Sequence, residues 1–377
     1  ERKFTMEKLF KLKEHGTDVK TEIIAGITTF LAMAYILAVN PSYLGGIDGM
    51  SAGAVFSATA ISAGIATLCM AFFANYPVAL ASGMGLNAFF AFTVCGAMGY
   101  SYKVALTAVF IEGIIFMLLS LFKFREALVN KIPSNLKFAI TAGIGLFIAI
   151  IALLNANVVV ASESTTVALG ELSSPTVVLS LVGLLIIGAL QHYKVPGGIL
   201  LGILITWVLG IIAQLVGWYV PNPEAGVYSV IPQFSLSSFE APKMFQFDFG
   251  FIAKNVPAFI LIVFTFLYTD IFDTVGTLIG VAEKGKLLDK DGSLPNATGA
   301  LMADAVGTVV GACFGTSTVT SYVESSAGVA AGGRTGLTAV TTAVLFFISL
   351  IFAPIFTSIP SFATTPAMLY VGLLMLS

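Results

Sequence analysis

The chain has 377 residues, of which 57% are hydrophobic and only 10% are charged, with a mean hydropathy of +0.97 and a formal net charge of −2. Because a soluble domain carries about 25% charged residues, this composition excludes a disordered chain, a nucleic-acid-binding protein and almost any cytosolic enzyme. The sequence is that of a protein that crosses a membrane several times.

Twelve runs of the sequence are apolar enough to cross a bilayer, since a spanning helix needs about 20 mostly apolar residues. These runs are residues 21–39, 52–73, 78–95, 103–122, 137–154, 176–190, 197–217, 252–282, 297–313, 316–330, 335–353 and 361–377. The run 252–282 is longer than one crossing requires, so we expect it to be tilted or to extend past the bilayer. The sequence therefore predicts an all-α polytopic membrane protein.

The basic residues indicate the orientation of the chain, because cytoplasmic loops of membrane proteins are enriched in Lys and Arg. With residues 1–20 in the cytoplasm, alternation of the segments places every Lys and Arg on that side except Lys103, Lys243 and Lys254. The residues placed inside include Lys123, Arg125, Lys131 and Lys290 in two connecting loops. We therefore expect a multi-pass protein of the cytoplasmic membrane with its N-terminus in the cytoplasm.

Two segments, Val78–Cys95 and Gly311–Arg334, are rich in Gly, Ser and Thr. Gly costs about 1 kcal/mol in a helix interior relative to Ala, and Ser and Thr offer competing local hydrogen bonds, so both segments are expected to be short or broken. Each is the third segment counted from Thr21 or from Ile252, and the two halves are related by an odd number of spans and hence inverted. Broken segments at equivalent places in inverted halves indicate a transporter's central site. The alternative is a pair of small-residue faces for helix packing.

Five acidic residues lie within apolar runs, where a charge costs at least about 2.5–3.5 kcal/mol on insertion scales. They are Glu112, Asp270, Asp273, Asp304 and Glu324. Glu112 is best explained by a hydrogen bond to a neighbouring Ser or Thr, and Asp304 by a role in holding helices together or relaying a proton. For Asp270 a structural and a functional role are equally well supported. Asp273 shares a helix face with Thr277, four residues further on.

Glu324 lies in the second broken segment, between hydroxyl-bearing residues. A carboxylate accepts two parallel N–H bonds, and a protonated carboxyl also donates, so this group suits a planar heterocycle and can couple its binding to a proton. Asn87, in the first broken segment, offers an amide that can read the edge of a base. Gly85 lets the backbone approach a flat ligand closely.

Four stretches together resemble the adenine/guanine/hypoxanthine permeases (AzgA-like), a branch of the nucleobase–cation symporter-2 family that includes the xanthine and uracil permeases. They are GITTFLAMAYI at 26–36, GMGLNAFF at 83–90, FDTVGTL at 272–278 and SYVESSAG at 321–328, and the resemblance extends over essentially the whole chain. It implies import of hypoxanthine, guanine or adenine by proton symport, with no cofactor, metal or nucleic-acid partner. It does not choose among the purines or between a proton and a sodium ion, and it leaves a homodimer open.

The resemblance also implies a fold of fourteen spans in two inverted repeats of seven, with short strands in spans 3 and 10. A core domain, residues 21–136 and 252–353, would move like an elevator against a gate domain, residues 137–251 and 354–377. By position, Asp273 and Glu324 match the acids that hold the base, and Asn87 and Gly85 match contacts from span 3. Thr277 stands where the uracil branch has a histidine, so the details of proton coupling in that branch are not applied to this chain. The candidates for proton coupling are Glu324, Asp273, Asp270 and Asp304.

The chain departs from the family pattern at its end, because Ser377 lies in the twelfth span and two expected gate helices, 13 and 14, are missing. We therefore expect a fragment or a truncated chain. Two other functions are less consistent with the sequence. An anion transporter or channel of the same architecture is disfavoured because acidic residues in the central cavity would repel an anion. An intramembrane aspartyl hydrolase would need Asp270 and Asp304 to converge, and no Gly-flanked Asp loop supports it.

Overall fold

The structure, a computed structural model, describes residues 7–121, 134–162, 165–221, 229–231, 240–289 and 294–374. Lys123, Arg125, Lys131 and Lys290, which the prediction of orientation uses, lie outside these residues. Within them, eight helices are long and apolar enough to cross a membrane. The described chain is mostly helical and also contains two small antiparallel sheets. The prediction of an all-α polytopic architecture is confirmed.

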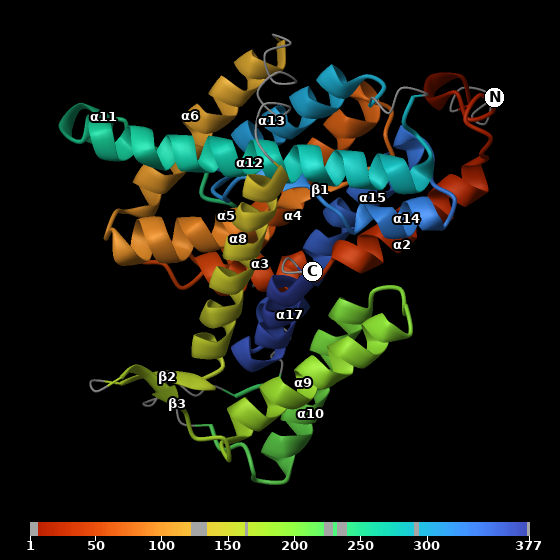
Figure 1. The fold of residues 1–377 in the computed structure, drawn as a ribbon. Helices are drawn as coiled ribbons and strands as arrows, with labels where there is room; N and C mark the ends of the chain where they lie inside the picture. Colours follow the sequence, from red (N-terminus) through yellow and green to blue (C-terminus); the bar gives the residue numbers. More distant parts are fainter. Residues whose placement is uncertain are drawn as a thin grey trace.

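Most helices form a first bundle, the upper part of Figure 1. Its first half contains α2 (Val19–Met33), α3 (Ile36–Leu44), α4 (Ala52–Phe73), α5 (Met84–Ala88), the π-helix η1 (Phe89–Ala97) and α6 (Tyr102–Leu121). Its second half contains α11 (Gly250–Lys254), α12 (Val256–Gly285), α13 (Ala297–Phe314), α14 (Ser325–Ala330), α15 (Gly336–Ser349), η4 (Leu350–Phe352) and α16 (Ala353–Thr357). The contacts between the halves are reciprocal. Helices α2 and α4 of the first half both pack on α15 of the second half, and the corresponding helices α12 and α13 of the second half both pack on α6 of the first half. This exchange is the arrangement expected of an inverted repeat.

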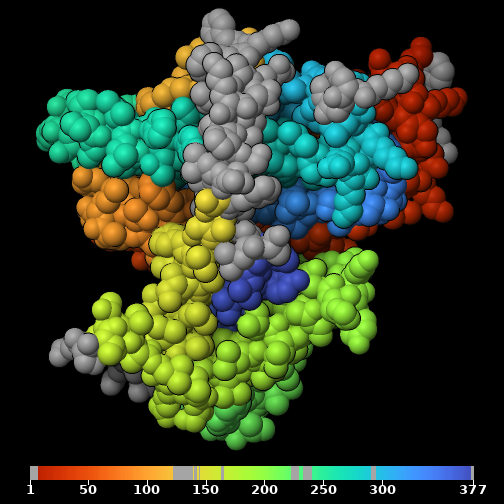
Figure 2. Space-filling view, viewed as in Figure 1, coloured from red at the N-terminus to blue at the C-terminus, as the bar shows by residue number. Residues whose placement is uncertain are grey.

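A second bundle contains α8 (Ser134–Asn155), α9 (Pro175–His192), α10 (Gly198–Leu215) and α17 (Ser361–Leu374). Helix α17 packs against α8, α9 and α10, and it also contacts α3 of the first bundle. Strands β2 (Val159–Ser162) and β3 (Thr166–Leu169) form a hairpin after α8. Figure 2 shows this bundle, in yellow and green, as a lobe below the first, with α17 in dark blue at the junction. The division of these bundles into a moving core and a gate stays a prediction.

Local sequence signals determine where several helices begin. The hydroxyl of Ser51 accepts the N–H of Ala54 at 3.4 Å and caps α4, and Ser174 caps α9 immediately before Pro175. A hydroxyl at this position satisfies an N–H that has no partner within the helix, and Pro at the first helical position has no N–H to satisfy. Thr335 caps α15 in the same way.

The two segments rich in Gly, Ser and Thr are broken, as predicted. The third segment begins with strand β1 (Leu80–Ser82) and continues as α5 and η1, and the tenth begins with β4 (Val319–Ser321) and continues as α14. The strands pair antiparallel, with Leu80 opposite Ser321 and Ser82 opposite Val319. All six strand residues are buried. Non-helical backbone at membrane depth is thus enclosed by protein, where its hydrogen bonds are made internally.

Candidate functional site

The paired strands are held by hydrogen bonds from both halves of the first bundle. The hydroxyl of Thr67 on α4 donates to the carbonyl of Leu80 at 3.1 Å and accepts its N–H at 2.9 Å. The N–H of Gly83 donates to the carbonyl of Thr318 at 3.0 Å, which extends the pairing beyond β1. These bonds fix the point at which each segment turns from strand to helix.

A cavity of about 110 Å³ lies beside the strand pair. It is lined by Tyr35, Gly83, Met84, Gly85, Asp273, Thr277, Thr320, Ser321, Tyr322, Val323, Glu324 and Val371. The structure therefore brings together four of the five residues predicted to bind substrate: Gly85, Asp273, Thr277 and Glu324. The volume is well below the roughly 300–1,000 Å³ of pockets for drug-sized ligands, and it suits a single small flat molecule.

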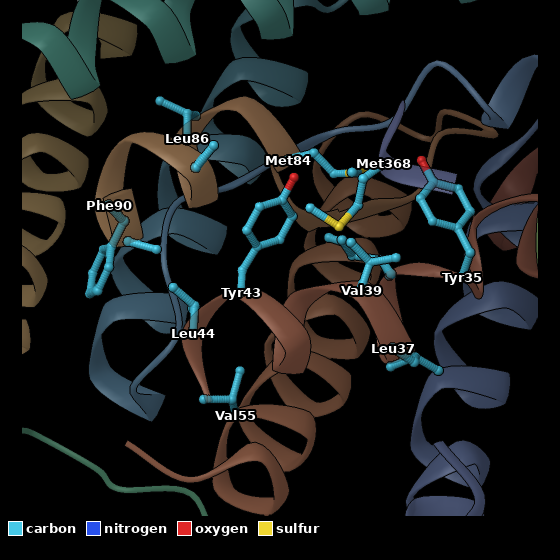
Figure 3. Close-up of a cluster of buried hydrophobic side chains, with 14 of the residues drawn as sticks. Tyr35, Leu37, Val39, Tyr43, Leu44, Val55, Met84, Leu86, Phe90 and Met368 are labelled. Atoms are coloured by element: carbon cyan, nitrogen blue, oxygen red, sulfur yellow. The ribbon is translucent and has the colours of Figure 1, made fainter. Parts of the chain in front are cut away.

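The cavity lies at the junction of the two bundles. Most of its lining comes from α5, α12, β4 and the residues that follow β4, with Tyr35 from the interruption between α2 and α3, but Val371 belongs to α17 of the second bundle. Figure 3 shows Met84 and Met368, the latter also on α17, between Tyr35 and Tyr43 in one buried apolar cluster. Flexible thioethers fill irregular space beside the site.

Two carboxyl groups border the cavity from different elements. Glu324 directly precedes α14, and its Oε1 accepts a hydrogen bond of 2.5 Å from the Tyr35 hydroxyl. Asp273 lies on α12, and Thr277 is one turn further along the same helix. Two carboxylates from separate elements of the second half thus face one small space, where each can accept N–H groups of a ligand.

Asp270 and Asp304 are also close to the strand pair, but neither lines the cavity. Oδ1 of Asp304 accepts the N–H of Ser321 at 2.9 Å and its hydroxyl at 2.8 Å, and Oδ2 accepts the Thr274 hydroxyl at 2.8 Å. The hydroxyl groups of Thr274 and Thr308 also lie 3.5 Å from the Asp270 carboxyl, but each has a nearer acceptor, Asp304 for Thr274 and the Val319 carbonyl for Thr308. Both carboxyl groups are fully buried, and they form a polar layer behind β4.

Asn87 is the predicted binding residue that does not line the cavity. Its side chain is buried, and its Oδ1 accepts a hydrogen bond from the Ser317 hydroxyl. Gly85 and Asn87 are two residues apart on α5, and residues two apart do not share a helix face. With Gly85 at the cavity, Asn87 therefore points elsewhere, and a direct contact between its amide and a ligand stays a prediction.

Two polar residues with clear structural partners were not singled out from the sequence. Tyr35 lies in an apolar span, where nothing distinguishes it from a core tyrosine. Glu22 lies beside the charged N-terminal segment, yet it is fully buried and accepts the N–H of Arg334 at 2.8 Å and the hydroxyl of Thr338 at 2.6 Å. These bonds tie the start of α2 to the start of α15. Glu112, within α6, is fully buried and away from the cavity lining.

Titratable side chains do not gather into a metal site in the described parts of the chain: no group of three or more His, Cys, Asp or Glu residues there could hold a metal ion. The polar lining of the cavity is instead made of carboxyl, hydroxyl and backbone groups. Such groups bind an organic ligand through directed hydrogen bonds.

A cavity beside two broken segments of inverted halves is the arrangement expected at the central site of a membrane transporter. The model of the Permease family (Xan_ur_permease) matches residues 20–377, and the chain belongs to this family. It is a transporter rather than an enzyme, so the hydrolase alternative is wrong.

Two relatives and one solved structure illustrate this membership. Adenine permease AdeQ of Escherichia coli is 44% identical over 373 residues, which cover 99% of this chain and 81% of the relative. Guanine/hypoxanthine permease PbuO of Bacillus subtilis is 46% identical over 377 residues, covering 98% and 83%. The transmembrane domain of a cyanobacterial bicarbonate transporter, BicA, superposes with a TM-score of 0.70 at 16% identity, covering 95% of this chain and 89% of that domain. This last likeness supports the inverted-repeat fold.

Proposed function

We propose that the protein imports purine nucleobases across the cytoplasmic membrane. The observation that carries this proposal is the cavity in which Asp273 of α12 and Glu324, which precedes α14, face one small space beside the paired strands of the two halves. Relatives 44% and 46% identical over nearly the whole chain are named as permeases of adenine and of guanine and hypoxanthine. The substrate class thus rests on these names together with the chemistry of the lining.

The lining fits the hydrogen-bonding pattern of a purine. A purine base presents ring N–H groups, which Asp273 and Glu324 can accept, and ring nitrogens or a carbonyl oxygen, which the Thr277 hydroxyl can approach as a donor. Met84 and Val371 supply apolar surface for the flat faces of the rings. Such a combination of apolar walls and a few directed polar groups is typical of small-molecule sites.

Proton symport is the second part of the proposal. A neutral base leaves two carboxylates in a small space inside the membrane, where charge is costly. A proton that binds together with the base would remove one of these charges, and Glu324 and Asp273 are the groups placed to receive it. Asp270 and Asp304 lie behind β4 and would take part only through the hydroxyl groups between them and the cavity.

The third part concerns the transport movement. We infer that a core domain, residues 21–136 and 252–353, carries the base past a gate domain, residues 137–251 and 354–377. The core domain comprises most of the first bundle and the gate domain most of the second. The position of Val371 at the edge of the cavity supports this division, because the wall contributed by α17 would be exchanged as the first bundle moves. A site held by one bundle and covered by the other can open to either side alternately.

The proposal is tested by uptake of radiolabelled hypoxanthine in cells that lack their own purine transporters. Excess unlabelled adenine or guanine should compete, uracil should not, and uptake should be faster below neutral pH and independent of sodium. Glu324→Ala and Asp273→Ala should abolish uptake, whereas Asp48→Ala, at an exposed loop position, should leave it unchanged. Robust purine uptake by Glu324→Ala, or uptake of chloride or sulfate in place of purines, would overturn the assignment.

A further inference from the structure

Tyr35 lies at the short interruption of the first span, between α2 and α3. Its side chain is only 1% exposed, and it lines the cavity beside the strand pair. The hydroxyl donates to Oε1 of Glu324 at 2.5 Å, and the two residues are 289 positions apart in the sequence. A short bond between a phenol and a carboxylate is of the stronger, charge-assisted kind.

We propose that Tyr35 is a positioning residue for substrate recognition: its hydroxyl fixes the carboxyl group of Glu324 so that the group's remaining acceptor capacity is directed at the ligand. The inference rests on the proposed function, because it assumes that Glu324 binds the purine. Nothing in the described residues other than Tyr35 offers a side-chain hydrogen bond to Glu324.

The backbone around Glu324 makes such a restraint useful. Glu324 is only half-buried and stands before the six-residue helix α14, so its own segment is short. A Glu side chain has three rotatable bonds, and a carboxyl that rotates freely loses entropy when a ligand orders it. Tyr35, packed in the buried cluster and limited to two side-chain torsions, holds the carboxyl before the ligand arrives.

Tyr43 provides a matched control in the same span. Its side chain is 3% exposed, and its hydroxyl has no hydrogen-bond partner in the described residues. Tyr35→Phe and Tyr43→Phe each remove one buried hydroxyl and keep the ring, so they impose similar changes on packing. Only the first of them removes a bond to Glu324.

The first measurement is the KM and maximal rate of hypoxanthine uptake, normalised to the amount of protein in the membrane. Tyr35→Phe should raise KM about tenfold, as expected for loss of a hydrogen bond to a charged group, and should leave the maximal rate within about twofold. Tyr43→Phe should leave both unchanged. A KM for Tyr35→Phe within twofold of wild type, or an equal rise for Tyr43→Phe, would overturn the inference.

The second measurement tests whether Tyr35 acts through Glu324. Hypoxanthine affinity is measured by calorimetry on purified full-length protein for wild type, Tyr35→Phe, Glu324→Asp and the double variant. Glu324→Asp keeps the charge but withdraws the carboxyl by one methylene, so Tyr35→Phe should weaken binding less than twofold in that background. An equal loss in both backgrounds would show that the hydroxyl acts elsewhere. Wild-type purine uptake tests the proposed function, and the ratios between variants test the role of Tyr35.

Discussion

Asp304 and Ser321 are joined behind strand β4 by two hydrogen bonds to the same carboxylate oxygen, one from the backbone N–H at 2.9 Å and one from the hydroxyl at 2.8 Å. Ser321 is the last residue of β4, and Asp304 lies in the middle of α13. The carboxylate therefore acts as an anchor that attaches the strand to the helix at Ser321, which itself lines the cavity.

Replacing Asp304 should separate an anchoring role from a proton relay. Asp304→Ala leaves the N–H and the hydroxyl of Ser321 without this acceptor, at about 1–3 kcal/mol for each buried donor left unpaired, and should lower the melting temperature and abolish purine binding. Asp304→Asn keeps an acceptor oxygen for Ser321 and should retain binding and most of the stability, as measured by thermal unfolding in detergent and by calorimetry. Equal damage from both variants would contradict an anchoring role. Normal purine binding with loss of proton-driven accumulation in Asp304→Asn would identify a relay.

The close packing of α14 against α2 should make Gly328 intolerant of a side chain. A Cβ at this position would lie 2.6 Å from the carbonyl oxygen of Ala25 and closer still to the hydroxyl of Thr29. Gly328→Ala should therefore destabilise the protein by about 1–3 kcal/mol and raise the KM for purines by displacing the segment that follows Glu324. The matched control is Gly280→Ala, because a Cβ there meets nothing within 4 Å and Ala favours a helix. Equal melting temperatures for the two variants would contradict the packing argument.

A pH-dependent contribution to stability is expected at the start of α2. Asp18 caps this helix through a bond of 2.9 Å from the N–H of Thr21, which holds the pKa of the carboxyl below its ordinary value of 3.8. Because the folded-state pKa is the lower one, the stabilisation is complete above pH 3.8 and is lost as the pH falls through the folded-state value. The difference in melting temperature between wild type and Asp18→Ala should be constant from about pH 7 to 5 and should disappear toward pH 2. Asp18→Asn, which caps without a charge, should show no such dependence.

The orientation of the chain can be measured by thiol labelling. In a variant without Cys69, Cys95 and Cys313, single cysteines replace Lys11 or Thr165, both of which are exposed. If the N-terminus is cytoplasmic, an impermeant maleimide should label the Thr165→Cys variant on intact cells and the Lys11→Cys variant only after permeabilisation. The opposite pattern would place the N-terminus outside and reverse the reading of the basic loops.

The sequence was most informative where composition and position agreed. The two broken segments could be predicted because Gly, Ser and Thr disfavour a helix and because both segments occupy the third place in their half. The acids Asp273 and Glu324 could be singled out because charge within an apolar run needs an explanation. The same logic passed over Glu22, whose position beside Asp18 and Lys20 resembles an ordinary solvated segment end.

Side-chain direction and strand register could not be read in this way. Strands β1 and β4 have three residues each, which is too short for a hydrophobic period to determine which residues face each other. Tyr35 meets Glu324 only because the first and tenth spans pack together, and no local pattern encodes that contact. The placement of Asn87 depends on the rotation of α5, since Gly85 and Asn87 cannot both face the cavity.

The pairing of β1 with β4 has a consequence for how the protein is made. Ser82 leaves the ribosome long before Val319, its partner, has been synthesised. Until then β1 has no partner strand. The Thr67 hydroxyl, which precedes β1 in the sequence, can already bond to the backbone of Leu80. Contacts between residues far apart in the sequence form late because closing a long loop costs entropy. The purine cavity is therefore completed at a late stage of biogenesis, and a nascent chain released before the tenth span would have inserted many of its helices without acquiring a binding site.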